Sequence, residues 1–408
     1  MAAASRRLPL LDSLRALTTL AILLAHTFGP AGVHANAHLH PYSTRFEFTI
    51  AIFLLLSAFL LYRPYARSRL DGRPWPPLKL YAWNRLTRVV PPYWVALTIT
   101  ALWITTAGVG VFTARGIPTY YGFGQIYSHD TVLGGIAIAW FLCILVAFYV
   151  VLPVYAGGMR RLGGSERGGR MRAELLGCAA LFAFSLAYRA LVVALGHRTD
   201  PGFNLLLPNY LDWLSAGMAL ALVSVWYGER WTAADDPCLP RVLRVFQRYP
   251  SLGFLIALVA FWAVSTRIGL NGPIPNTGFQ YFAEHLLNLV IALGVFVPLA
   301  IGDPRVGLTR RALDNRLLLW LSVISYGILL YHLAVIEQLK SWGFDPGAGA
   351  RSYVLWPIVT LALTLPFAVA NHRLIERPLE RLSPFRRGRG AAGPPAPDRT
   401  PAAAATAE

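Results

Sequence analysis

The sequence predicts an all-α fold, namely a polytopic membrane helix bundle with about ten transmembrane helices. Of its 408 residues, 55% are hydrophobic and only 14% are charged, whereas about 25% of the residues in an average soluble protein are charged. The chain contains 12 Trp and 18 Tyr, which are residue types that gather where helices cross a membrane surface. Apolar stretches of about 20 residues, the length that spans a bilayer, recur along the whole chain.

The first apolar segment begins after two arginines, as a signal peptide would. Asp12 and Arg15 interrupt it, however, and no small-residue cleavage pattern follows His26. We therefore expect it to be retained as the first transmembrane helix. The ten predicted segments lie near residues 9–29, 47–62, 89–108, 132–156, 174–195, 204–227, 250–266, 284–302, 317–339 and 352–372.

The formal net charge is +17, because 37 Lys and Arg stand against 20 Asp and Glu. A charge of this size would also suit a nucleic-acid-binding protein, so the distribution of the basic residues decides its meaning. With the N-terminus in the cytoplasm, most of them fall in the N-terminal segment, in every second connection and in the C-terminal tail. The positive-inside rule explains this pattern. We expect an integral, multi-pass protein of the cell membrane, surrounded by lipid, with both termini cytoplasmic and no nucleic-acid partner.

Residues 1–384 form one predicted transmembrane domain, and residues 385–408 form a predicted disordered cytoplasmic tail. The tail is basic and rich in Pro and Ala, with few large apolar side chains to offset the entropy of ordering. Cys143, Cys178 and Cys238 lie far apart, without the spacing of a disulfide framework or a metal site. We therefore expect no metal.

Arg15 and His26 are the clearest candidate site residues, because ionisable groups inside a membrane span are costly and often functional. Eleven residues make about three helical turns, so both side chains project from nearly one face, roughly 16 Å apart along the axis. A histidine can accept a proton from an alcohol near neutral pH. A packed, hydrogen-bonded imidazole is an equally weighted alternative for His26. The sequence contains neither a G-x-S-x-G nucleophile motif nor an H-E-x-x-H metal motif.

Arg85 and Arg88 lie three residues apart at a predicted helix start, on the predicted cytoplasmic side. Two arginines on one helical turn can clamp phosphate oxygens in bidentate fashion. The alternative is that they are interfacial arginines that obey the positive-inside rule without binding a ligand.

Arg189 and Asp212 fall at similar depth in neighbouring spans, so we expect them to form a structural ion pair. His332 lies in the outer half of the ninth span. We favour the interpretation that it is a packed histidine, and the alternative is that it is a second histidine of the site. Should His26 not be the base, Glu47, Glu284 and His332 are the next candidates near the outer face.

Motifs along the chain occur in a characteristic order. After the Arg-x10-His spacing of Arg15 and His26 come the run FLLLSAFLLYRP and the R-x-x-R motif of Arg85 and Arg88, and then WFLCILVAFYVVLP, LDWLSAGMAL, ISYGILLYH and IERP. In their number and order, these motifs resemble those of the acyltransferase-3 family of integral membrane acyltransferases. The resemblance extends from about Leu10 to about Leu382.

The resemblance implies a membrane-bound O-acyltransferase that moves an acyl group to a hydroxyl of a sugar, glycan, lipid or macrolide. The donor would be acetyl-CoA or another acyl-CoA, and the acceptor partner a hydroxyl-bearing glycan or glycolipid. By resemblance, His26 and Arg15 belong to the catalytic site, and Arg85 and Arg88 hold the CoA phosphates. The alternative function is a transporter or exporter of a lipid or glycan without acyl-transfer chemistry.

The chain also departs from the family pattern at three positions. Ala51 stands where many relatives have Asp, Ala58 where they have Gly, and Leu145 where they have Glu. The missing Glu at Leu145 bears on the choice of acceptor.

Overall fold

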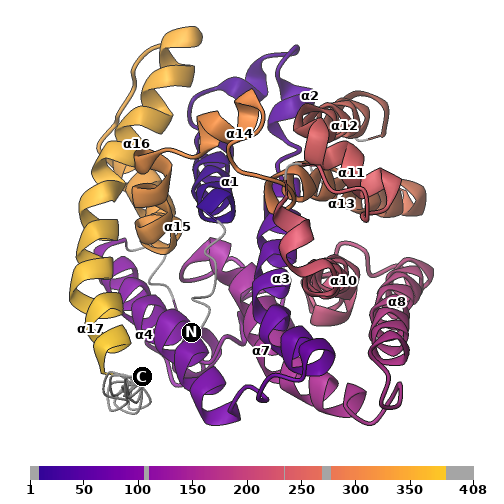
Figure 1. Ribbon diagram of the computed structural model, residues 1–408. Helices are drawn as coiled ribbons and strands as arrows, with labels where there is room; N and C mark the ends of the chain where they lie inside the picture. Colours follow the sequence, from indigo (N-terminus) through magenta and orange to yellow (C-terminus); the bar gives the residue numbers. More distant parts are fainter. Residues whose placement is uncertain (1–8, 105–109, 234, 269–276, 383–408) are drawn as a thin grey trace, which may run out of the picture.

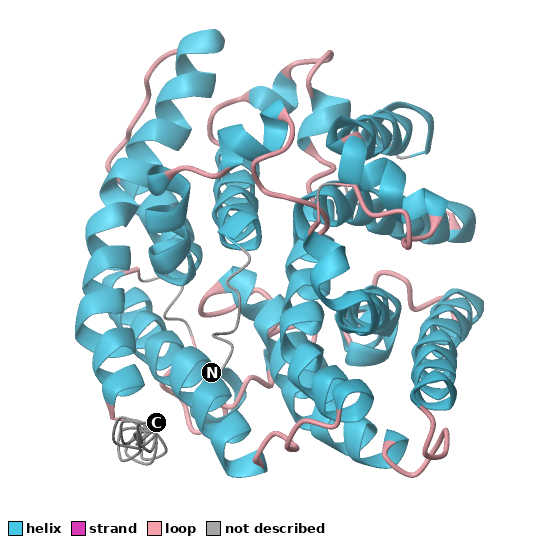
Figure 2. Ribbon diagram, in the orientation of Figure 1, coloured by secondary structure: helices cyan, strands magenta, loops and turns pink. Residues whose placement is uncertain are grey.

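The computed structural model describes residues 9–104, 110–233, 235–268 and 277–382. Within these ranges all regular secondary structure is helical and no strand occurs (Figure 2). The predicted all-α fold is therefore confirmed. The predicted tail, residues 385–408, lies outside the described ranges.

Ten long helices of the described chain coincide with the ten apolar segments of the sequence. The segment predicted from residue 132 becomes helical only near Trp140, because Gly135 adopts a left-handed backbone conformation with a φ of 64° that interrupts a helix. The long helices are α1 (Pro9–Thr27), α3 (Phe48–Asp71), α4 (Leu78–Trp103), α7 (Trp140–Met159), α8 (Arg167–Ala194), α10 (Leu211–Tyr227), α12 (Pro250–Ala263), α13 (Gly278–Ala300), α15 (Arg316–Ser341) and α16 (Ala350–Asn371).

Nine helical spans within the described ranges are long and apolar enough to cross a membrane. The helix outside this group is α4, which begins well before the predicted segment 89–108. Its first half carries Lys79, Arg85 and Arg88, and its centre contains Pro91 and Pro92, so its apolar stretch is interrupted by charged and polar residues. The chain is a polytopic helical bundle, as predicted. In the described ranges nine spans are long and apolar enough to cross a membrane, whereas the sequence predicted about ten.

Short helical elements connect the long helices. They place polar side chains at the ends of the bundle, and several of them border the sites described below. They are α2 (His40–Ser43), α6 (Gly116–Tyr121), α9 (Pro201–Asn204), α11 (Arg241–Arg248), α14 (Leu308–Leu313) and α17 (Arg377–Arg381), the 3-10 turns η1 (Val33–Ala35), η2 (Gln125–Tyr127), η3 (Ala137–Ala139), η4 (Leu207–Tyr210) and η5 (Gly228–Thr232), and the π turns η6 (Val264–Ile268) and η7 (His372–Glu376).

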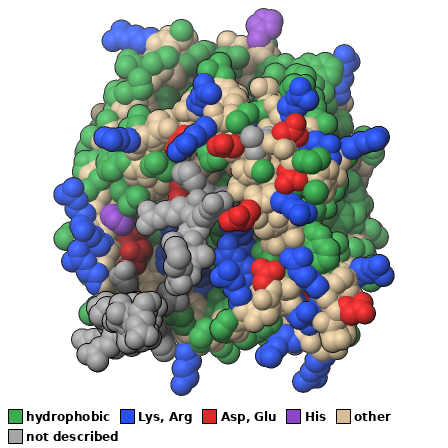
Figure 3. Space-filling model, viewed as in Figure 1, with side chains coloured by type: hydrophobic (Ala, Val, Ile, Leu, Met, Phe, Trp, Pro, Cys, Tyr) green, Lys and Arg blue, Asp and Glu red, His purple; other side chains and the backbone are tan. Residues whose placement is uncertain are grey.

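The bundle has a central part and a lipid-facing periphery. Helix α15 packs against both α1 and α16, and α3 packs against α10 and α13 (Figure 1). Of the apolar, membrane-spanning stretch of α15, 72% is buried inside the protein, whereas 22% is buried in α8 and in the span containing α16. Helices α8 and α16 therefore lie at opposite flanks, where Figure 1 shows them. Hydrophobic side chains cover much of the upper and lateral surface, and Lys and Arg crowd the middle and lower part of the same face (Figure 3).

Small residues allow the closest helix contacts. A Cβ atom added to Gly217 of α10 would lie 2.3 Å from the carbonyl oxygen of Leu55 in α3, and Gly253 and Gly294 make a similar approach between α12 and α13. Helix association within a membrane depends on such close packing, because lipid provides little hydrophobic driving force between helices. These glycines therefore fix the positions of α3, α10 and α13, which carry much of the pocket described below.

One fully buried arginine joins the loops at one end of the bundle. Arg310 of α14 donates hydrogen bonds to the carbonyl oxygens of Phe246, Pro298 and Ile301 at 2.8, 2.8 and 2.7 Å. Burial lowers its pKa to about 10, so it stays charged at neutral pH. The guanidinium thereby satisfies carbonyls at the ends of α11 and α13 that lack helical partners.

Candidate functional site

The structure brings His26 and His332 together. His26 lies near the end of α1 and His332 on α15, and their rings stack with centroids 5.0 Å apart and planes at 28°. Nδ1 of His26 lies 2.9 Å from Nε2 of His332, and Nδ1 of His332 lies 3.0 Å from the carbonyl oxygen of Ile328. The predicted site histidine thus has a second histidine as its direct partner, and our preferred interpretation of His332 as mere packing overlooked this contact.

The hydrogen bonds assign the tautomers of both rings. The Ile328 carbonyl can only accept, so Nδ1 of His332 carries the hydrogen and Nε2 of His332 accepts. His26 must then donate from Nδ1, which leaves the lone pair on its Nε2. No group in the described ranges is hydrogen-bonded to that nitrogen. His332 is fully buried and His26 half-buried, so the free lone pair belongs to the more accessible ring.

Arg15 gathers with the two predicted phosphate-binding arginines instead of with His26. It interacts electrostatically with Arg88 and Arg85 of α4 and with Tyr149 of α7. Among the described residues, Asp12 lies 3.5 Å from the Arg15 guanidinium, and Glu376 interacts with Arg88. Positive charge therefore exceeds negative charge in this cluster of three arginines. It lies about three helical turns from His26 along α1.

Arg189 and Asp212 interact through a third residue. His285 of α13 lies between them, with Nδ1 2.7 Å from Nη2 of Arg189 and Nε2 2.7 Å from Oδ2 of Asp212. Ser185 also donates to Asp212 at 3.1 Å. The predicted ion pair is thus present only in this indirect form. Both nitrogens of His285 are occupied, so this histidine lacks the free lone pair that His26 has.

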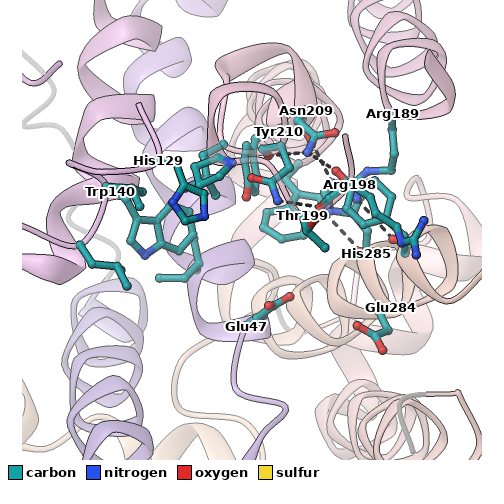
Figure 4. A pocket seen from close by; sticks show the side chains of 18 of the residues that line it. Glu47, His129, Trp140, Arg189, Arg198, Thr199, Asn209, Tyr210, Glu284 and His285 are labelled. Atoms are coloured by element: carbon teal, nitrogen blue, oxygen red, sulfur yellow. Dashed lines mark hydrogen bonds between the residues drawn. The ribbon is translucent and has the colours of Figure 1, made fainter. Parts of the chain in front are cut away.

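A pocket of about 530 Å³ opens beside this network (Figure 4). It is lined by residues from α3, α7, α8, α10 and α13 and from the connections that precede α7 and α10. Glu47, at the start of α3, extends between His129 and Trp140 on one side and Arg198 and Thr199 on the other. In the sequence analysis Glu47 was a candidate base only if His26 is not the base.

Several acceptors in the pocket have no hydrogen-bond partner among the described residues. Asn204 and Asn209 each have a buried Oδ1 without a hydrogen bond in the described chain, and the carboxylate of Glu47 interacts electrostatically with Arg45 and Arg189. Glu284, by contrast, is bound by Arg45 at 2.9 Å. The rings of Trp140 and Tyr210 lie 6.2 Å apart at the wall. The pocket therefore combines aromatic surface with acceptors that a hydroxyl-bearing ligand could satisfy.

The family comparison agrees with this architecture and with the order of the motifs. A family described as an acyltransferase domain, acyltransferase-3, matches residues 8–372. The chain belongs to the acyltransferase-3 family. It is therefore an acyltransferase and an integral membrane protein. No curated protein and no solved structure matches it significantly.

The family assignment leaves the roles of individual residues to be argued from the geometry. Ala51 and Leu145, at which the resemblance to the family leads us to expect carboxylates, are both buried in the apolar core. No cluster of metal-ligating side chains occurs within the described ranges. Among the candidates, His26 is the one with both an orienting partner and an unoccupied nitrogen.

Proposed function

We propose that this acyltransferase moves an acyl group, acetyl in the first instance, from acyl-CoA to a hydroxyl of a glycan or glycolipid. The observation that carries the proposal is the hydrogen bond from His26 to His332, which leaves Nε2 of His26 as an oriented base. An alcohol is a weak nucleophile until its proton has an acceptor, and a neutral imidazole provides one near neutral pH.

The chemical step balances on these groups. Nε2 of His26 takes the proton of the acceptor hydroxyl while the oxygen attacks the thioester carbonyl carbon. When the tetrahedral intermediate collapses, the C–S bond breaks, and the thiolate of CoA receives the proton from His26. The products are an ester and free CoA. His332 positions His26 and accepts a stronger hydrogen bond while His26 is an imidazolium.

The arginine cluster suits the donor. Arg15, Arg85 and Arg88 place three guanidiniums at one end of α1, and planar guanidiniums bind phosphate in bidentate fashion. The pantetheine arm of the donor would then extend along α1 to bring the thioester to His26, about 16 Å away along the axis.

The 530 Å³ pocket suits the acceptor. Trp140 offers an aromatic face for a sugar ring, and Glu47 and Asn209 offer acceptors for its hydroxyls. One contact links the histidine end of α1 to the residue before the lining residue Glu47: Phe28, two residues after His26, contacts Phe46 with ring centroids 5.3 Å apart.

The test is a transfer assay with the purified full-length protein, acetyl-CoA and a panel of glycan and glycolipid acceptors, scored for free CoA and acylated product. His26→Ala should lower the rate by about 10² to 10⁴, the usual contribution of a general base, and His26→Gln should not restore it. His38→Ala is the matched control, because His38 is exposed in the loop after α1. Movement of a lipid or glycan without release of CoA would instead support the transporter alternative.

A further inference from the structure

A second pocket lies where the end of α3, the end of α7 and the beginning of α8 meet, on the lower side in Figure 1. Its volume is about 310 Å³. Four of its lining residues are arginines and none is acidic. The lining consists of Ser68, Arg69, Arg73, Trp75, Arg160 and Arg170.

Arg69 has a structural role in this pocket. Its Nε donates to Oε1 of Glu174 at 3.1 Å and its Nη2 to the carbonyl oxygen of Met159 at 2.7 Å. Tyr62 also donates to the Glu174 carboxylate. Asp71, at the end of α3, is bound by Arg167 at 3.2 Å. The nearby carboxylates Glu174 and Asp71 are therefore occupied by groups other than the remaining pocket arginines.

The other three arginines form no ion pair with a carboxylate of the described chain. Nε of Arg170 is buried and lacks a hydrogen-bond partner there. The guanidinium of Arg160 lies 4.5 Å above the ring of Trp75, a cation–π contact that orients it. Arg73 is exposed at the rim. The cavity thus presents positive charge without a carboxylate partner among the described residues, together with a buried donor that none of these residues satisfies.

We propose that this pocket binds a phosphomonoester. Guanidiniums match the geometry and charge of phosphate, and a buried unpaired donor gains most from such a partner. The hydroxyl of Ser68 is a further polar group of the lining, and it donates to the carbonyl oxygen of Arg73 at 2.8 Å.

The second part of the proposal names the source of the phosphate and rests on the proposed function. Coenzyme A carries two separate phosphate groups, a 3′-phosphomonoester and a diphosphate. The pocket is linked to the Arg85 cluster by aromatic contacts, from Trp75 to Tyr65 at 5.2 Å and from Tyr65 to Tyr81 at 6.0 Å. Tyr81 and Arg85 lie one turn apart on α4. The pocket takes the 3′-phosphate, and the arginine cluster takes the diphosphate.

The test compares the binding of CoA and of dephospho-CoA, which lacks the 3′-phosphate, to the purified full-length protein without any acceptor. Wild type should bind CoA more tightly. Arg160→Gln and Arg170→Gln should each weaken CoA binding about tenfold, as the loss of one charge-assisted contact predicts, and leave dephospho-CoA unchanged. Arg161→Gln and Arg172→Gln are matched controls, because both arginines are exposed and lie outside the pocket lining. A thermal unfolding curve for each variant verifies that it is folded.

A second measurement on the same variants tests whether the phosphomonoester belongs to a lipid instead of CoA. Phosphatidic acid retained by the purified variants is counted by native mass spectrometry. Loss of this lipid with unchanged CoA binding would keep the phosphate site and overturn its assignment to the donor. Unchanged binding of both CoA and lipid in both variants would overturn the site itself. Selective CoA binding by a wild-type protein that transfers no acyl group would retain the site and reject the proposed function.

Discussion

Replacement of His332 tests whether the second histidine orients the proposed base. His332→Leu keeps a similar buried volume, but it removes the acceptor 2.9 Å from Nδ1 of His26. The hydrogen on Nδ1 then has no partner, and the His26 ring loses its preferred tautomer and orientation. His332→Gln retains an acceptor oxygen and is the conservative counterpart.

The expected magnitude follows from the change of charge during the reaction. In the ground state the contact joins two neutral rings, and a hydrogen bond of this kind contributes about 0.5–1.5 kcal/mol net, whereas one to a charged group contributes about 1.5–3 kcal/mol. The difference, about 1–2 kcal/mol, is realised only when His26 is an imidazolium. Since 1.4 kcal/mol is about a factor of ten, kcat should fall roughly 5- to 30-fold.

The assay is steady-state CoA release at saturating acceptor, with kcat and KM determined separately. Loss of an interaction made only in the transition state lowers kcat while the KM for acyl-CoA stays nearly constant. His332→Gln should recover part of the rate. A wild-type kcat in His332→Leu, or an equal loss in the Leu and Gln variants, would refute the orienting role and leave His332 as a packing residue.

Two further predictions concern the donor site and the topology. Arg85→Lys and Arg88→Lys keep the positive charge but lose the planar fork, so the KM for acyl-CoA should rise about tenfold in each; unchanged values in both would leave these arginines only a topological role. Single cysteines introduced at Ser165 and Leu308, in the α7–α8 connection and at the start of α14, should react with membrane-impermeant reagents only from the cytoplasmic side; strong labelling from outside would reject the predicted orientation.

The sequence was sufficient to predict the helices, because a bilayer imposes a length and an apolar composition that can be read locally. The predicted helix boundaries were wrong where a property other than apolar composition decides the first residue of a helix. Helix α4 begins at Leu78, well before the apolar stretch, since charged and aromatic interfacial residues continue a helix as readily as apolar ones. Residues before Trp140 were predicted to be helical because they are apolar, but Gly135 interrupts the helix.

The contacts within the site could not be predicted in the same way. His26 and His332 are 306 residues apart, and their meeting depends on α1 packing against α15. Packing between membrane helices is decided by small residues and shape, which a single sequence does not reveal. The grouping of Arg15 with Arg85 depends likewise on the packing of both α1 and α4 against α15.

The pocket was harder still to predict, because its lining comes from helix ends and short connections of five long helices. Each lining residue has an ordinary local explanation. Trp140 suits a membrane interface, and Asn204 suits the end of a short helix such as α9. Only the assembled structure shows that the amide oxygen of Asn204 has no hydrogen-bond partner in the part of the chain that is described.

The arrangement of charge suggests why the base is oriented by a neutral group. A buried carboxylate next to His26 would be costly inside a membrane span, and no carboxylate of the described residues is hydrogen-bonded to the His26–His332 pair. His332 instead fixes the tautomer of His26 without burying a charge, and its own tautomer is fixed by the Ile328 carbonyl, which is always present. The charged groups lie elsewhere, in the arginine clusters and around the large pocket, where ligands can neutralise them. In the proposed mechanism, binding would use charge, and proton transfer would use two neutral rings.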